Sequence, residues 1–172
     1  MVNDMLDFMD ITKDNVHLYC RFDKSFEDDL SNFQSRIYPK NSDFFVPMIQ
    51  NGLLRWSYLF FDGKIIGAIW LEKEHHSLPS ATLGIFIADK EKRSQGIGEE
   101  AINRYIEMYK DRLNLTEVNL HVRKENIRAI RCYEKCGFVT EQEFEKADGT
   151  KTLSMTKTIA RRQNPVDFAK VS

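Results

Sequence analysis

The pattern of apolar and polar positions is clearest in the middle of the chain, where it predicts a β-hairpin. Two apolar runs, Trp56–Phe61 and Lys64–Leu71, flank the pair Asp62-Gly63, and this pair is a strong signal for a tight two-residue turn. Similar short runs predict further strands, with a second turn at Asp148-Gly149; these strands are Leu6–Ile11, Leu83–Ile87, Glu117–Val122, Gly137–Phe144 and Thr150–Thr158.

Apolar residues three and four positions apart predict helices between several of these strands. Gln95–Arg112 carries an apolar stripe, and Asn126–Lys135 ends before Gly137, a favourable residue for a helix end. Nearer the N-terminus we expect a helix from Thr12 or Asp14 through Cys20, a second one over Phe26–Tyr38, and a loop over 40–50 that Pro39 and Pro47 bracket.

Strands that alternate with helices and close on a hairpin predict one α/β domain with a central sheet of mixed direction, mostly antiparallel and flanked by helices. The length of 172 residues also fits a single domain. We divide it into an acceptor-side segment at 1–55 and a core at 56–158 within a domain of 1–160, followed by a tail at 161–172.

Composition narrows the function classes. Hydrophobic residues make up 42% and the formal net charge is −1, which disfavours a nucleic-acid binder that relies on massed phosphate contacts. The longest apolar stretch, Ile65–Leu71, is far shorter than the ~20 residues of a membrane span. No basic and apolar leader opens the chain, so we expect a soluble, cytoplasmic protein. Charge is uneven, with net −4 over residues 1–50 and +3 over the rest.

The three cysteines indicate neither a disulfide framework nor a metal site. Cys132 and Cys136 are four residues apart on one helix face, and the other ligands that zinc needs have no evident source. We expect buried, reduced thiols that pack as small apolar groups, and we predict no metal.

The segment Arg93-Ser94-Gln95-Gly96-Ile97-Gly98 lies between a predicted strand and a predicted helix. Its glycines let the backbone approach a ligand, and the free N–H groups of the helix start favour phosphate. A Walker A loop would need Gly-Lys-Ser/Thr, whereas Gly98 is followed by Glu99. The spacing Gly96-x-Gly98-x-x-Ala101 fits a relaxed dinucleotide fingerprint, but the first glycine lies too far from the strand.

A second motif favours another family. The run from Asn126 through Tyr133 to Gly137-Phe138, together with Arg93-x-x-Gly96-x-Gly98, resembles the GNAT superfamily of acetyl-CoA-dependent N-acetyltransferases over roughly residues 55–158. The motifs are similar to those of aminoglycoside 6′-, spermidine and ribosomal-protein N-acetyltransferases. Residues 1–55 match none of these persuasively.

The resemblance implies acetyl-CoA as the acetyl donor, and it implies a role for each motif. The CoA-binding residues would be Ile85, Phe86 and Ile87 on a splayed strand, the loop residues Arg93, Ser94, Gln95, Gly96, Ile97 and Gly98, and Asn126 on the next helix. Tyr133 would give a proton to the departing CoA thiolate. From the residues alone, Tyr133 would instead be a core side chain of an amphipathic helix.

No general base can be assigned from the sequence. The strand around Leu83–Ile87 contains no carboxylate, Thr82 stands near the position where some family members keep a glutamate, and Glu72, Glu74, His75 and Asp89 are only nearby candidates. A chain of water molecules would serve as well.

We therefore expect an enzyme that moves acetyl from acetyl-CoA to a primary amine by direct attack. Acidic residues Glu27, Asp28, Asp29 and Asp43 favour a small cationic acceptor such as an aminoglycoside or polyamine, or a basic peptide or protein N-terminus. The alternatives are a non-catalytic acyl-CoA-binding sensor and a nicotinamide or flavin dinucleotide domain. An exposed edge strand could pair two copies in a homodimer; neither nucleic acid nor membrane is expected as a partner.

Overall fold

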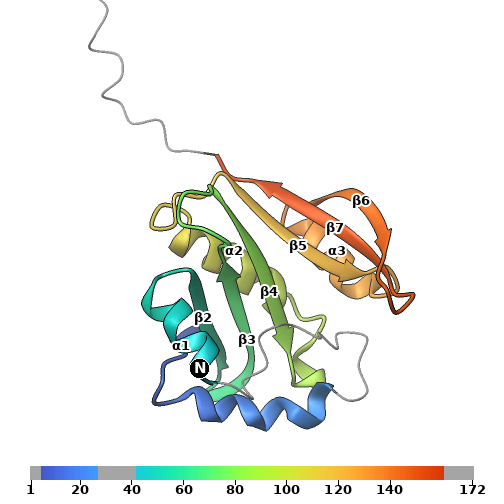
Figure 1. Cartoon of the computed structure of the whole chain (residues 1–172). Coiled ribbons are helices and arrows are strands. Elements are labelled where there is room, and N and C mark those ends of the chain that lie inside the picture. The colour runs from blue at the N-terminus through green and yellow to red at the C-terminus, as the bar shows by residue number, and fades with distance from the viewer. Residues whose placement is uncertain (1–4, 27–41, 161–172) are drawn as a thin grey trace, which may run out of the picture.

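The structure, a computed structural model, describes residues 5–26 and 42–160 of the chain, and its centre is a seven-stranded sheet (Figure 1). The strand order across the sheet is β1-β2-β3-β4-β5-β7-β6. The strands are β1 (Leu6–Asp10), β2 (Leu54–Phe61), β3 (Lys64–Glu72), β4 (Ser80–Ile87), β5 (Glu117–Arg123), β6 (Val139–Glu145) and β7 (Lys151–Thr158). Each predicted strand is confirmed, with ends that differ by at most three residues.

The sheet opens between its two central strands. Every neighbouring pair is antiparallel except β4 and β5, which run parallel and pair only over Ser80–Thr82 and Glu117–Asn119. Beyond Thr82, β4 continues to Ile87 on β3 alone, and Figure 1 shows β4 and β5 diverging toward the lower part of the view. This mixed, mostly antiparallel sheet confirms the predicted fold class.

Helices cover both faces of the sheet. α2 (Ile97–Tyr109) and α3 (Ile127–Lys135) pack on one face, where Ile102, Tyr105, Tyr133 and Phe138 join the larger apolar core. The opposite face carries a 3₁₀ helix, η1 (Val16–Phe26), and α1 (Ser42–Gln50). Side chains of η1 and of the strands form a second core there, against which α1 packs. Both predicted central helices are confirmed, with α2 shorter at each end than Gln95–Arg112.

The N-terminal helix prediction is only partly correct, because the helix there is η1, a 3₁₀ helix that begins at Val16. Tyr19 and Phe22 are three residues apart, so a three-residue turn puts both rings on the same side. Both rings are buried, and both make edge contacts with Phe86, at centroid distances of 5.6 and 5.0 Å. Packing of both rings against Phe86 therefore favours a 3₁₀ helix in place of the helix expected from Thr12 or Asp14 through Cys20.

The predicted loop over 40–50 is wrong, because Ser42–Gln50 forms α1 with Pro47 inside it. A proline inside a helix removes a hydrogen bond and usually breaks the element. Here Met48 and Ile49, which follow it, pack against the second core, and this burial favours the helix despite the lost bond. The helix expected over Phe26–Tyr38, apart from its first residue, and the tail at 161–172 lie outside the described residues.

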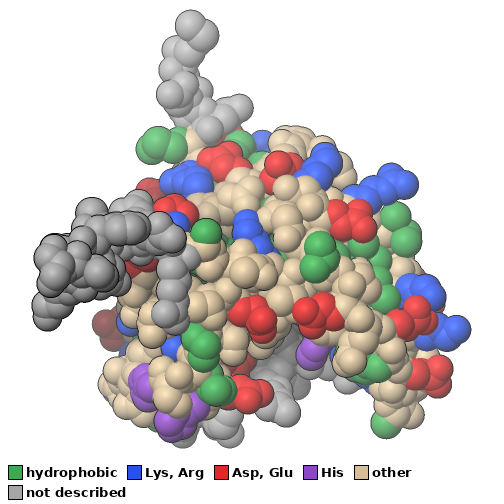
Figure 2. Space-filling model, turned by 90° about the horizontal axis from the view of Figure 1, so that it is seen from above, with side chains coloured by type: hydrophobic (Ala, Val, Ile, Leu, Met, Phe, Trp, Pro, Cys, Tyr) green, Lys and Arg blue, Asp and Glu red, His purple; other side chains and the backbone are tan. Residues whose placement is uncertain are grey.

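Charged side chains of both signs are interspersed over the face seen from above (Figure 2). No helix in the described part of the chain is long and apolar enough to cross a membrane.

Candidate functional site: a cationic pocket at the split of the sheet

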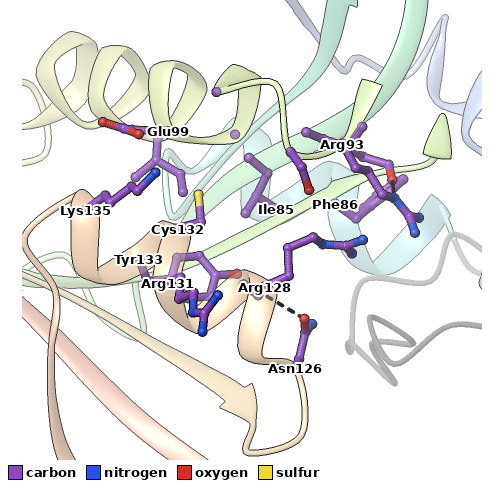
Figure 3. A pocket seen from close by; sticks show the side chains of 16 residues that line it. Ile85, Phe86, Arg93, Glu99, Asn126, Arg128, Arg131, Cys132, Tyr133 and Lys135 are labelled. Atoms are coloured by element: carbon purple, nitrogen blue, oxygen red, sulfur yellow. Dashed lines mark hydrogen bonds between the residues drawn. The ribbon is translucent and has the colours of Figure 1, made fainter. Parts of the chain in front are cut away.

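A pocket of about 420 Å³ lies where β4, the start of α2 and α3 meet (Figure 3). Strand β4 and the following loop form one side, and α3 forms the other. The lining residues are Ile85, Phe86, Ile87, Arg93, Ser94, Gly96, Gly98, Glu99, Ile102, Asn126, Arg128, Ala129, Arg131, Cys132, Tyr133 and Lys135.

The free edge of β4 presents backbone groups to this pocket. The N–H of Ala88 donates to Ile66 O of the β3 side at 2.8 Å, whereas Pro79 O, on the β5 side, accepts from Thr116 N at 2.7 Å. Because successive residues of a strand point their backbone groups to opposite edges, Ile85 and Ile87 share the edge of Pro79. They lie beyond the short pairing with β5, so their N–H and C=O groups face the split.

The loop after β4 turns sharply into α2. Ser94 and Gly96 both have positive φ, +61° and +82°, and Gly96 is the residue before the helix, whose carbonyl accepts the first helical bond from Glu100 N at 3.0 Å. The N–H groups of the first turn have no partner within a helix, and the helix dipole adds partial positive charge there. The start of α2 is therefore suited to an anion.

Gly98 keeps this helix start open. A Cβ at this position would lie 3.4 Å from Cys132 Sγ and 3.8 Å from Ile87 Cδ1, so a side chain would close the gap between α2 and α3. Gly98 therefore lets the backbone of the first turn line the pocket.

Four cationic side chains line the pocket and one acidic side chain opposes them. Arg93 is held by a bond from its Nε to Ile87 O at 2.7 Å. Arg128, Arg131 and Lys135 project from α3, and Glu99 is the acidic residue. Guanidinium groups bind phosphate in a bidentate manner, so the lining is suited to a ligand with several phosphates.

Tyr133 is buried in the core, and its ring reaches the pocket. Burial, and to a smaller extent the neighbouring thiols Cys132 and Cys136, raise the pKa of Tyr133 well above its usual value of ~10. Its hydroxyl has no hydrogen-bond partner within the described part of the chain. Tyr133 therefore stays protonated near neutral pH and can donate a hydrogen bond or a proton to a ligand.

Asn126 begins α3 at the same pocket. Its Oδ1 accepts a bond from Ala129 N at 3.2 Å, which caps the helix. Asn126 is thus fixed one heptad, ~10 Å along the helix axis, from Tyr133, and both line the pocket.

The structure brings together nine of the eleven residues that the sequence singled out. The side chains of Gln95 and Ile97 lie elsewhere, because Gln95 Nε2 donates to Glu91 O at 2.5 Å and Ile97 packs in the core. Gln95 and Ile97 can therefore contact a pocket ligand only through their backbone groups.

Sequence reasoning missed the cationic face of α3. Arg128, Arg131, Cys132 and Lys135 stand at spacings of three, four and seven, which is one helix face. That spacing is the signal in the sequence that indicates a shared helix surface.

Of the two cysteines whose side chains the structure describes, only Cys136 is buried as expected. Cys136 is buried, at 3% exposure, whereas Cys132 lines the pocket and is partly exposed. The side chain of Cys20 lies outside the described side chains. No group of three or more potential metal ligands occurs within residues 5–26 and 42–160.

None of the base candidates lines the pocket. His75 bonds to Ser77 in an exposed loop, and Asp89 caps a short turn by accepting from Glu91 N at 3.0 Å. Glu72 ends β3, on the opposite face of the sheet from α3, in register with Thr82. The acidic residues Glu27, Asp28 and Asp29 lie outside the described residues, as does the side chain of Asp43.

A split mixed sheet, a glycine-containing turn at a helix start and a cationic helix beside it define a class of α/β proteins that bind a phosphate-bearing cofactor. The family model described as "Acetyltransferase (GNAT) family" matches residues 17–138. Since this match covers most of the chain, the protein belongs to the acetyltransferase (GNAT) family, and the resemblance found in the sequence is confirmed.

Relatives with known names support the same family. Spermidine N(1)-acetyltransferase of Vibrio cholerae serotype O1 (strain ATCC 39315 / El Tor Inaba N16961) is 38% identical over 78 residues. The aligned part is 45% of this chain and 44% of the relative, so less than half the length of that curated relative is matched.

Solved structures share the fold. Spermidine N-acetyltransferase from Vibrio cholerae in complex with CoA and spermine superposes with a TM-score of 0.70 at 22% identity, covering 89% of this chain and 95% of that one. A dodecameric structure of the same enzyme in an intermediate state gives 0.71 at 21% identity, covering 89% and 93%.

Proposed function

We propose that this protein is an N-acetyltransferase that moves the acetyl group of acetyl-CoA to a primary amine by direct attack. The observation that carries the proposal is the pocket itself, where a free strand edge, an open helix start, a cationic helix face and a protonated tyrosine converge. A relative in the same family is a spermidine acetyltransferase, and a neighbour of the same fold is a complex with CoA.

Different pocket residues would contact different parts of acetyl-CoA, the acetyl donor. The first-turn N–H groups of α2, with Arg93 and Arg128, would hold the pyrophosphate, and Arg131 and Lys135 would take further negative charge. The backbone groups of Ile85 and the N–H of Ile87 would pair with the amide-bearing arm as an added strand does, while the Ile87 carbonyl stays bonded to Arg93 Nε. This arrangement directs the thioester toward Tyr133.

The reaction then needs three events. The neutral amine nitrogen attacks the thioester carbon, a backbone N–H of β4 stabilises the oxyanion, and the C–S bond breaks. The departing thiolate takes the proton of the Tyr133 hydroxyl, and the attacking nitrogen loses its extra proton to solvent. The Tyr133 phenolate then regains a proton from solvent, which restores the starting state. We leave the general base unassigned, because Glu99, the carboxylate among the described lining residues, lies in the first turn of α2, where the phosphates would bind.

For the acceptor we propose a small cationic amine, with polyamines as the first class to test, since a relative in the family acts on spermidine by its name. A basic peptide or protein N-terminus is the wider class to be compared. Association into a homodimer or larger ring is also proposed, because the edge strands β1 and β6 are unpaired within the described chain and a neighbour of this fold is dodecameric. A cytoplasmic location stays a prediction.

The direct test is release of CoA from acetyl-CoA with a panel of polyamines, aminoglycosides, amino acids and basic peptides, alongside calorimetric titration of acetyl-CoA. Turnover with one amine class would support the enzyme and identify its acceptor. Binding without turnover across the panel would favour the acyl-CoA sensor instead, and absence of binding would overturn the proposal.

A further inference from the structure

Two cysteines form a pair at the side of the pocket nearest to α2. Cys132 lines the pocket, and its sulfur points toward α2 in Figure 3. Cys136 is one helical turn further along α3, buried, with its thiol 3.9 Å from the carbonyl oxygen of Glu99. One sulfur can therefore meet a pocket ligand, and the other is enclosed behind it.

The neighbours of the partly exposed Cys132 thiol shift its pKa downward. The hydrogen bond from Cys136 lowers the pKa of Cys132, and Lys135 and Arg128 act in the same direction; burial and Glu99 oppose them. The same contact raises the pKa of the Cys136 thiol, which therefore keeps its proton. A lowered thiol pKa in a cationic, partly accessible site favours reaction at that sulfur.

The pocket also selects what can reach that sulfur. Among the described residues that line the pocket, Arg93, Arg128, Arg131 and Lys135 outnumber the acidic Glu99. A cleft with one dominant charge sign raises the local concentration of oppositely charged solutes by about tenfold or more. Small anionic molecules are therefore favoured at Cys132 over cationic ones of the same size.

We propose that Cys132 is a modification site that takes a mixed disulfide from a small anionic disulfide, of which glutathione disulfide is the probe. The Cys132 thiolate attacks one sulfur of the disulfide, and a new bond joins Cys132 Sγ to that half. The old S–S bond breaks, and the other half leaves as a thiolate that takes a proton from water. The incoming disulfide is the oxidant, so no other co-reactant is needed.

The bound half would occupy the space in front of Gly98, where the gap between α2 and α3 is narrow. It would thereby exclude acetyl-CoA until a reducing thiol removes it. This consequence rests on the proposed function, whereas the modification itself rests only on the pocket and the two thiols.

The test is peptide mapping by mass spectrometry of the intact full-length chain after incubation with glutathione disulfide, and in parallel with the cationic disulfide cystamine. We expect one adduct, at Cys132, formed about tenfold faster with glutathione disulfide, lost on reduction and absent in Cys132→Ser. Cys136→Ala should slow the reaction, and Cys20→Ser, the matched control, should not. No adduct, an adduct placed on another cysteine, or equal rates with the two disulfides would overturn the proposal.

Excess acetyl-CoA separates this proposal from the proposed function. Protection of Cys132 by acetyl-CoA supports both. An adduct that forms equally fast with and without acetyl-CoA supports the modification and counts against the pocket as the acetyl-CoA site. The mapping on the wild-type chain needs no variant, so it decides the matter even where Cys132→Ser does not fold.

Discussion

Two polar clusters contact helix α2, and they differ in whether their polar groups have hydrogen-bond partners among the described residues. One is the pocket at the start of the helix. The other, which we call the tyrosine network, lies beneath its second half and consists of Asp10, Ser57, Tyr105 and Tyr109. Both contain a buried tyrosine whose pKa burial raises, so the tyrosine alone does not distinguish them.

The tyrosine network is closed. Ser57 Oγ donates to Asp10 Oδ1 at 3.0 Å and lies 3.0 Å from the Tyr105 hydroxyl, and the Tyr109 hydroxyl donates to the same carboxylate oxygen at 3.5 Å. Ser57 and Tyr105 are fully buried. These bonds link the edge strand β1 to β2 and to α2, so the hydroxyls of Ser57, Tyr105 and Tyr109 have partners inside the chain and a structural role.

The pocket is open. Arg128 and Arg131 are exposed, the Tyr133 hydroxyl has no partner among the described residues, and the edge of β4 beyond Thr82 has no second strand. Polar groups left without internal partners around one cavity indicate a ligand that supplies the partners. The comparison therefore separates a tyrosine that holds the fold together from one available for chemistry.

The largest expected effect comes from Tyr133→Phe. Loss of a general acid typically lowers a rate by about 10²-fold or more, and we expect this loss in kcat while the acetyl-CoA Kd changes by less than about threefold, since the ring remains. The measurement is steady-state turnover with the best amine, plus calorimetry.

Tyr105→Phe is the matched control, because it removes the same hydroxyl from the closed network. We expect its kcat to stay near that of the wild type. Equal turnover in Tyr133→Phe and the wild type would remove Tyr133 from the mechanism.

A smaller effect is expected from the cationic face of α3. Changing both Arg128 and Arg131 to Gln should raise the acetyl-CoA Kd by about tenfold at low salt, since two charge-assisted contacts are lost from exposed side chains. The effect should shrink as salt rises, because exposed charges are screened.

The control for this pair is Lys64→Gln with Lys151→Gln, which removes two exposed positive charges away from the pocket. If both double variants weaken binding equally, net charge rather than the pocket face is responsible.

The sequence predicted the open cluster better than the closed one, for physical reasons. Gly96 and Gly98 indicate the loop in the sequence, because a backbone that turns and approaches a ligand favours glycine. Asn126 and Tyr133 stand at helical spacing in a recognisable motif. Ser57 and Tyr105 are 48 positions apart, and no local pattern connects them. They meet only because β2 and α2 pack face to face.

The N-terminal part failed for a related reason. Pro47 predicted a loop, and only the burial of Met48 and Ile49 against residues of the distant strands allows a helix there. The importance of the three-residue spacing of Tyr19 and Phe22 was similarly visible only once Phe86 was known to contact both rings. Local propensity decides where packing is weak, and tertiary contact overrides it where packing is strong.

The smallest expected effect is an alkaline loss of stability that both tyrosines share. Burial raises the folded-state pKa of Tyr105 and of Tyr133, whereas the unfolded chain releases each phenol proton near pH ~10. Their contribution is fully present below that pH and is lost as pH rises further, by about 1.4 kcal/mol per pH unit for each tyrosine. The measurement is urea unfolding from about one pH unit below to about one unit above the unfolded pKa of ~10. The free energy of unfolding should decline more steeply with pH in the wild type than in Tyr105→Phe or Tyr133→Phe. The pH slope of the unfolding free energy should fall by the same amount in the two variants, which should differ only in kcat. A Tyr105→Phe curve parallel to that of the wild type would instead show that the Tyr105 phenol titrates normally. The two clusters would then differ in the burial of their tyrosines as well as in hydrogen-bond partners.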